Sequence, residues 1–119
     1  TLPNMTYQGS ATIYLGDLAL ELHNVHIHSK DTNVLYIPSE KILFAGDALE
    51  DTLTFIGEPG ELSTHLRNLE LLNTWGIARI YPNHGDPNII AEGGYKTTLI
   101  DATLEPHQPI CSSGVWGIL

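Results

Sequence analysis

The chain has 119 residues, enough for one domain with one hydrophobic core, and an ordinary globular composition with 42% hydrophobic residues. Its net charge of −9 argues against binding to long nucleic acids, and its single cysteine excludes an internal disulfide or a cysteine-based zinc site. No apolar run approaches the roughly 18–20 residues that cross a bilayer, and the N-terminus has no basic, apolar leader, so we expect a cytoplasmic protein with no membrane partner.

Four apolar segments in the first half of the chain predict β-strands. Residues 11–15 and 18–27 flank a Gly-Asp turn signal and should pair as a hairpin. Residues 34–38 and 42–45 form a second pair. Because both segments of the second pair are apolar on both faces, we expect them to be covered on both sides.

The clearest predicted helix spans residues 59–76, with a proline at its start and a glycine at its end. Its apolar side chains recur every three or four residues, which predicts one buried face. The residues expected on that face are Leu62, Leu66, Leu69, Leu72 and Trp75.

The remaining segments alternate between strand, turn and helix. Residues 77–81 predict a short strand, and residues 82–88 predict a turn. A second helix is expected over residues 94–105, where Pro106 ends it. Residues 106–119 fit neither a helical nor a strand pattern and are interpreted as a separate C-terminal tail.

Histidine and aspartate side chains occur where three of the predicted strands end. His28 follows the second strand, Asp47 closes the fourth, and His84 follows the fifth. Strand ends hold side chains rigidly while leaving them open to solvent. Imidazole and carboxylate groups suit zinc, manganese or Fe(II), and a carboxylate can bridge two such ions. The pattern therefore favours a metal-dependent hydrolase.

His26 lies two residues before His28, and on an extended chain the two imidazoles would point to the same side. The predicted metal ligands are therefore His26, His28, Asp47 and His84. Two neighbouring charged residues are further catalytic candidates beside Asp47. Lys30 could contact a phosphate, and Asp31 could orient ligands or transfer protons. His65 and His107 are interpreted as surface or hydrogen-bonded histidines.

In the order of its motifs the chain resembles the C-terminal half of a metallo-β-lactamase-fold, metal-dependent hydrolase. The resemblance rests on His28 after a strand, Gly46-Asp47 closing an extended pair, and His84-Gly85 after a later strand, and it covers residues 11–105. It implies two divalent transition-metal ions, zinc, manganese or iron. In that arrangement Asp47 bridges the two ions, His28 ligates one and His84 the other.

The family's His-x-His-x-Asp-His cluster is absent, so residues 1–105 are interpreted as a truncated domain and residues 106–119 as a tail outside it. The expected fold is α/β, half of an αββα sandwich, with a mixed sheet and two helices. A half-sandwich exposes apolar surface, and a two-fold homodimer is the commonest way to cover such a surface. We therefore expect homodimerisation, with the apolar residues of the tail contributing to it.

The predicted function is hydrolysis of a small-molecule phosphodiester, such as a cyclic nucleotide, by a dinuclear metal site that activates water. An open site of this kind suits phosphodiesters, whose oxygens dock on the ions themselves. It suits less well a lactone or β-lactam that needs a shaped organic pocket. One alternative is a lactonase or other carboxylic-ester hydrolase with the same metals. Another is a non-catalytic, truncated remnant, which would bind little metal.

Overall fold

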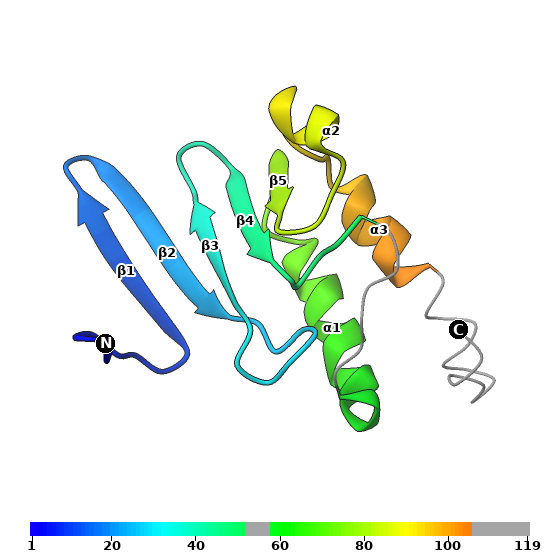
Figure 1. The fold of residues 1–119 in the computed structure, drawn as a ribbon, viewed down its shortest axis with the longest axis horizontal. Coiled ribbons are helices and arrows are strands. Elements are labelled where there is room, and N and C mark those ends of the chain that lie inside the picture. Colours follow the sequence, from blue (N-terminus) through cyan, green and yellow to red (C-terminus); the bar gives the residue numbers. More distant parts are fainter. Residues whose placement is uncertain (52–57, 106–119) are drawn as a thin grey trace.

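The fold of the chain in the computed structural model is a single sheet with helices packed on one side (Figure 1). The structure describes residues 1–51 and 58–105. The predicted C-terminal tail, residues 106–119, lies outside the described residues. Within them, the expected α/β class with a mixed sheet is confirmed.

The strands follow one another across the sheet in chain order. They are β1 (Ser10–Leu15), β2 (Leu18–Asn24), β3 (Asn33–Ile37), β4 (Ile42–Gly46) and β5 (Arg79–Pro82). The first four form an antiparallel meander, and β5 runs parallel to β4. A parallel neighbour requires a long crossover connection, and the helix between β4 and β5 provides it.

The crossover helix is shorter than predicted. A turn of 3-10 helix, η1 (Pro59–Glu61), leads into α1 (Leu62–Leu72), so the helix ends four residues before Gly76. Among the residues that the structure describes, no helix is long and apolar enough to span a membrane.

Two further helices follow β5, one more than the sequence predicted. The expected turn contains a short helix, α2 (Pro87–Ala91), because the Asp86 carboxylate accepts a hydrogen bond from the backbone N–H of Asn88 and proline occupies the first helical position. The last helix, α3 (Thr98–Leu104), begins four residues later than predicted.

The hydrophobic core lies between one face of the sheet and the helices α1 and α3. On the sheet side it is built by alternate residues of β3, β4 and β5, namely Val34, Tyr36, Leu43, Ala45 and Ile80. On the helix side it is built by Leu69, Leu72, Leu99, Ile100 and Leu104. Of these ten residues, the most exposed retain 8% of their surface, so this face is fully covered where β3, β4 and β5 form it.

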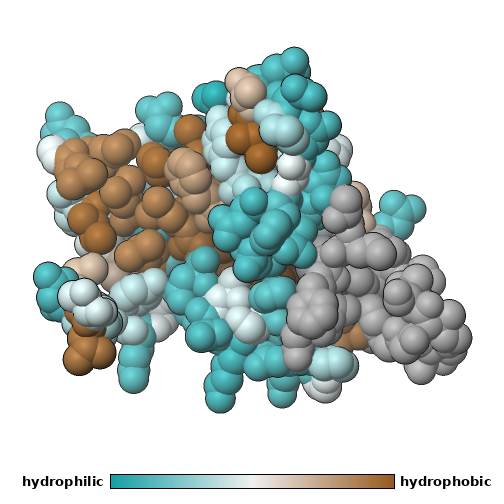
Figure 2. Space-filling view, in the orientation of Figure 1, coloured by the Kyte–Doolittle hydropathy of each residue, from teal (hydrophilic) through white to brown (hydrophobic). Residues whose placement is uncertain are grey.

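The opposite face of the sheet is open, which corrects the expectation that residues 34–38 and 42–45 are covered on both sides. Phe44 is 43% exposed and Leu15 is 61% exposed, because both helices that pack on the sheet lie on its other face. Figure 2 shows the resulting apolar patch over β1 to β4. By strand register, the open sheet face consists of Ala11, Ile13, Leu15, Leu18, Leu20, Leu22, Leu35, Ile37, Ile42 and Phe44.

Candidate metal-binding sites

The end of β4 is shaped by a bulge that precedes Asp47. The pairing register between β4 and β5 shifts between Phe44 and Gly46, and Gly46 has a φ angle of 56°, where a Cβ atom would be strained. Asn83, just after β5, donates from its backbone to the Gly46 carbonyl at 3.0 Å and from Nδ2 to Asp47 Oδ1 at 3.2 Å. The bulge therefore places Asp47 beside the segment that carries His84.

Asp47, Glu50 and His84 form a cluster of three potential metal ligands, called the Asp47 cluster below. His84 Nδ1 lies 3.3 Å from Asp47 Oδ1 and 3.1 Å from Glu50 Oε1. Ligand atoms that lie about 2.0–2.2 Å from one ion are roughly 3.0–3.5 Å from each other, which these distances match. Two carboxylates and one imidazole suit zinc, manganese or iron. The residues of the cluster therefore fit a divalent transition metal.

Sequence reasoning found Asp47 and His84 but missed Glu50. The side chain of Glu50 is 12% exposed, whereas those of Asp47 and His84 are 40% and 69% exposed. A signal was present, because Glu50 is a carboxylate three residues after Asp47 in the same connection. That spacing alone does not show that the chain turns back toward the end of β5.

Tyr95 ties the two loops of the Asp47 cluster together. Its hydroxyl donates to Asp51 Oδ2 at 2.5 Å and accepts from the backbone N–H of Asp86 at 2.6 Å. The backbone N–H of Asp51 also donates to the carbonyl oxygen of His84 at 3.1 Å. Desolvation, followed by the hydrogen bond to Asp51, raises the pKa of Tyr95 above its ordinary value. A tyrosine hydroxyl is already protonated at neutral pH, and this shift favours the protonated form further, so the hydroxyl remains a donor.

Tyr95→Phe should lower the affinity of the Asp47 cluster for zinc about tenfold, because residues that orient metal ligands typically contribute 10–100-fold. Isothermal titration of metal-free protein measures the effect. Tyr7→Phe is the matched control. It also removes a tyrosine hydroxyl, but that hydroxyl lies in the N-terminal segment, where it donates to Asn33 Oδ1 at 2.8 Å. Equal affinities for zinc in both variants would show that Tyr95 does not position the cluster.

The predicted extended pair of His26 and His28 is not present, because β2 ends at Asn24. His26 and His28 have φ angles of 44° and 71°, in the left-handed region, so the chain turns at both histidines. Ile27, between the two histidines, and Val25, just before them, point into the core, with 1% and 9% of their surfaces exposed. The apolar run that suggested a longer strand is therefore a buried loop.

The two histidines also differ in their neighbours. Among the described residues, the structure places His26 with Glu58 and His65, and it places His28 in neither cluster of three potential ligands. His26 Nε2 is 3.2 Å from Glu58 Oε2, and His65 Nε2 is 3.6 Å from the same oxygen. The two imidazole rings meet edge to face with centroids 5.3 Å apart.

The interpretation of His65 as a surface or hydrogen-bonded histidine is corrected, because the residue is 4% exposed and its Nε2 atom has no hydrogen-bond partner. Desolvation, followed by the proximity of His26, lowers the pKa of His65, although Glu58 acts in the opposite direction. The sequence held a signal for this burial. His65 lies three residues after Leu62 and four before Leu69, on the apolar stripe of α1.

Lys30 and Asp31, predicted as catalytic residues, lie at another place on the surface. Both line a hollow against the N-terminal segment, together with Asn24 and Asn33. Asp31 Oδ1 accepts a hydrogen bond from the Ser29 hydroxyl at 2.8 Å. None of the three residues of the Asp47 cluster lines this hollow. Their catalytic roles remain predictions.

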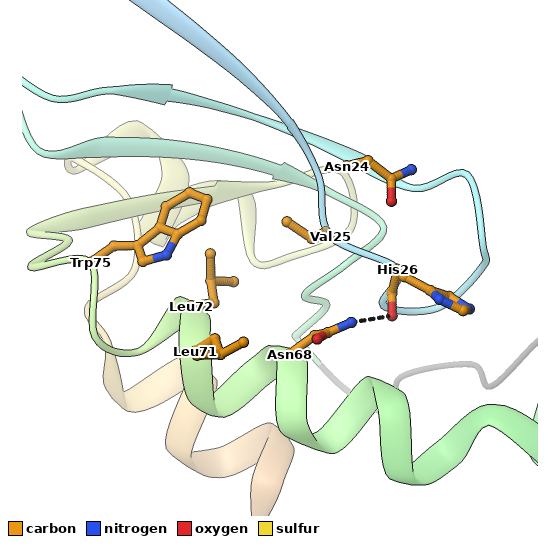
Figure 3. Close-up of a pocket in the computed structure, with 7 residues that line it drawn as sticks. All are labelled: Asn24, Val25, His26, Asn68, Leu71, Leu72 and Trp75. Carbon is orange, nitrogen blue, oxygen red and sulfur yellow. Dashed lines mark hydrogen bonds between the residues drawn. The ribbon is translucent and has the colours of Figure 1, made fainter. Parts of the chain in front are cut away.

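A pocket of about 330 Å³ lies between α1 and the loop after β2 (Figure 3). It is lined by Asn24, Val25, His26, Asn68, Leu71, Leu72 and Trp75. Asn68 Nδ2 donates to the backbone carbonyl of His26 at 3.3 Å, and the imidazole of His26 points away from the apolar lining (Figure 3). Because none of the described residues that line this pocket is an acid, a lysine or an arginine, they offer no fixed charge to an ionic substrate.

No protein-family model matches the chain, and no curated protein matches it. Solved structures do. A metallo-β-lactamase family protein from Thermus thermophilus superposes with a TM-score of 0.73 at 18% identity, over 94% of this chain and 38% of that one. A metallo-β-lactamase from Pontibacter korlensis gives 0.69 at 24% identity, over 88% of this chain and 48% of that one.

An archaeal metallo-β-lactamase superfamily protein from Sulfolobus tokodaii gives a TM-score of 0.61 at 12% identity, over 86% of this chain and 38% of that one. The chain therefore spans between about two fifths and one half of the length of these three proteins. At these identities the likeness shows the fold, and it agrees with the resemblance found in the sequence motifs.

Proposed function

We propose that this chain, which has part of the metallo-β-lactamase fold, is a metal-dependent hydrolase whose metal is held by Asp47, Glu50 and His84. The observation that carries the proposal is that two carboxylate oxygens each lie within 3.3 Å of one imidazole nitrogen, beside the ends of two adjacent parallel strands. The proposed substrates are small phosphodiesters, such as cyclic nucleotides. A cytoplasmic location is part of the same proposal.

The residues of the Asp47 cluster have separable tasks. A bound divalent ion lowers the pKa of water from 15.7 toward about 7, which supplies a nucleophile at neutral pH. Asp47 and Glu50 offset the charge of the ion, and His84 adds a nitrogen ligand. Asn83 fixes the orientation of the Asp47 carboxylate through its hydrogen bond. With 69% of its side chain exposed, His84 leaves the cluster accessible to substrate.

The charge of the protein favours a substrate that docks on the metal itself. The chain carries a net charge of −9, and two carboxylates form the cluster, so an anionic phosphodiester is repelled unless a cation is present. An exposed cluster also suits a phosphodiester better than a lactone, which depends on a shaped apolar pocket. Lactonase or carboxylic-ester hydrolase activity with the same metals is the alternative.

The proposal includes a second ion. Two ions about 3.5–4 Å apart would clamp the attacking and leaving oxygens of a phosphodiester. Asp47 would then bridge, and His28, in the loop between β2 and β3, is the sequence's candidate ligand for the second ion. His26 is held by Glu58 in the present arrangement, so it is not included in this site.

Reconstitution with metal tests the hydrolase proposal. Protein dialysed against a chelator is reloaded with zinc or manganese, metal content is measured by elemental mass spectrometry, and hydrolysis of bis(p-nitrophenyl) phosphate is compared with that of a lactone and an aryl ester. We expect phosphodiester hydrolysis that is lost on chelation and restored by metal. Preferential lactone or ester hydrolysis would support the alternative. Failure to bind metal, with no turnover, would identify the chain as a non-catalytic remnant.

We also propose that a second copy of this chain covers the open sheet face. No charged side chain of β1 to β4 belongs to this face, so an equally apolar partner is required, and a second copy presents the same surface about a two-fold axis. The face measures roughly 20 by 20 Å from strand spacing and rise. Two such faces packed about 10 Å apart bury on the order of 1,000 Å², the size at which specific interfaces begin.

A further inference from the structure

His65 carries a buried nitrogen atom without a hydrogen bond. Its side chain lies on the inward face of α1 between Leu62 and Leu69, and its Nε2 atom is inaccessible to solvent and has no hydrogen-bond partner. The 3.6 Å separation from Glu58 Oε2 is too long for a hydrogen bond. A buried polar atom without a hydrogen bond costs free energy, and a bound ion or water is one arrangement that removes this cost.

The Nε2 atom of His65 lies near two other potential ligands. Glu58 Oε2 is 3.2 Å from His26 Nε2 and 3.6 Å from His65 Nε2, and all three atoms lie within 4.8 Å of one another. Two ligands on a tetrahedral zinc ion, each about 2.0–2.1 Å from it, are roughly 3.3–3.4 Å apart. The two measured separations bracket that value, so small side-chain movements would complete the geometry.

We propose that His26, Glu58 and His65 form a second metal site, separate from the Asp47 cluster, which binds one divalent transition-metal ion. Two imidazoles and one carboxylate select zinc or a similar ion over calcium and magnesium, which prefer oxygen ligands. Three protein ligands leave a fourth position for water or another small ligand.

The surroundings give the site both rigidity and access. Asn68, one turn after His65 on α1, donates to the backbone carbonyl of His26 at 3.3 Å and so fixes the loop that carries this ligand (Figure 3). The side chain of His65 is 5% exposed, whereas those of His26 and Glu58 are 24% and 35% exposed. An ion can therefore enter past His26 and Glu58, with His65 as the buried anchor.

A metal in this position would join three segments that are distant in the sequence. His26 belongs to the loop after β2, Glu58 precedes η1, and His65 lies in α1. An ion that binds the folded chain and not the unfolded one raises the melting temperature with its concentration. The site is therefore inferred to have a stabilising role, whether or not the Asp47 cluster is catalytic.

Zinc titration in an Asp47→Asn background isolates the proposed site from the Asp47 cluster. We expect this variant to bind one equivalent of zinc, detected by calorimetry, and to melt at a higher temperature when zinc is added. Adding Glu58→Gln should weaken that binding by at least about 100-fold, because losing a ligand costs more than the 10–100-fold effect of losing a residue that orients one. Adding His26→Gln should have the same effect.

Glu61→Gln is the matched control, since Glu61 is an exposed carboxylate three residues after Glu58, where it accepts from the Thr64 hydroxyl at 3.3 Å. It should leave zinc binding unchanged. Nitrogen NMR of the histidine rings should show zinc-dependent shifts at Nε2 of both His26 and His65. Full zinc affinity in both the Glu58→Gln and His26→Gln variants would overturn the proposal. So would Nε2 signals of His26 and His65 that do not shift when zinc is added. Neither readout depends on hydrolysis.

Discussion

Asp47→Ala should reduce metal-dependent hydrolysis of bis(p-nitrophenyl) phosphate by at least about 100-fold, the upper end of what is lost when a residue that only orients a metal ligand is changed. The carboxylate of Asp47 lies 3.3 Å from His84 Nδ1, and without it Glu50 and His84 would be left as two ligands. Two ligands hold a cation weakly, so metal content should fall together with turnover.

Two further variants separate this effect from a loss of folding. Asp47→Asn keeps the size of the side chain and should be almost as inactive, because an amide carries no negative charge. Asp101→Asn is the matched control, since the Asp101 carboxylate also accepts from an asparagine side chain, that of Asn73 at 3.0 Å, but lies on α3. It should keep full activity. Undiminished turnover in Asp47→Asn would disprove the site assignment.

Phe44→Glu should raise the dissociation constant of the proposed homodimer by at least about 100-fold, because an unpaired charge buried between two apolar sheets costs several kcal/mol. Phe44 lies in β4 on the open sheet face, where it stacks on Tyr81 with ring centroids 5.4 Å apart. Because 43% of its surface is exposed, the monomer should tolerate the substitution. Sedimentation velocity measures the change, with the wild type expected at twice the chain mass of 13.1 kDa.

Tyr14→Glu provides the control for the added charge. Tyr14 lies on the opposite face of the sheet, paired with Ala19, and is 72% exposed. This variant should remain dimeric. A wild-type protein that stays monomeric at every soluble concentration would rule out a second copy as the occupant of the open face. A mass that rises only when a different protein is added would point to a heterologous partner instead.

Local sequence patterns were sufficient for most of the fold. Strands β1, β3 and β4 follow from short apolar runs bounded by turn signals, and each begins and ends within one residue of the predicted position. A prediction was wrong where loop residues that are buried by tertiary contacts produced the same apolar pattern as a strand. Val25 and Ile27 are buried in a loop, so their hydrophobicity extended the predicted second strand beyond Asn24.

The sequences of the strands do not show which face of the sheet is covered and which is open. Leu35 and Phe44 are as apolar as Val34 and Leu43, yet the first pair faces outward and the second pair faces α1 and α3. An apolar side chain indicates a surface that is more stable when buried, but it does not show which element buries it. The helices occupy one face, and the other remains available to a partner.

The sequence by itself determined the order of the strands that carry the motifs and two of the proposed ligands, Asp47 and His84, because local periodicity shows where those strands end. Only the tertiary structure decided which further groups meet them. Glu50 joins His84 through the bulge at Gly46, and His26 joins Glu58 and His65 through a turn and a crossover helix. These meetings depend on left-handed backbone angles and on packing between segments up to 39 residues apart, from His26 to His65. No local pattern encodes such distances.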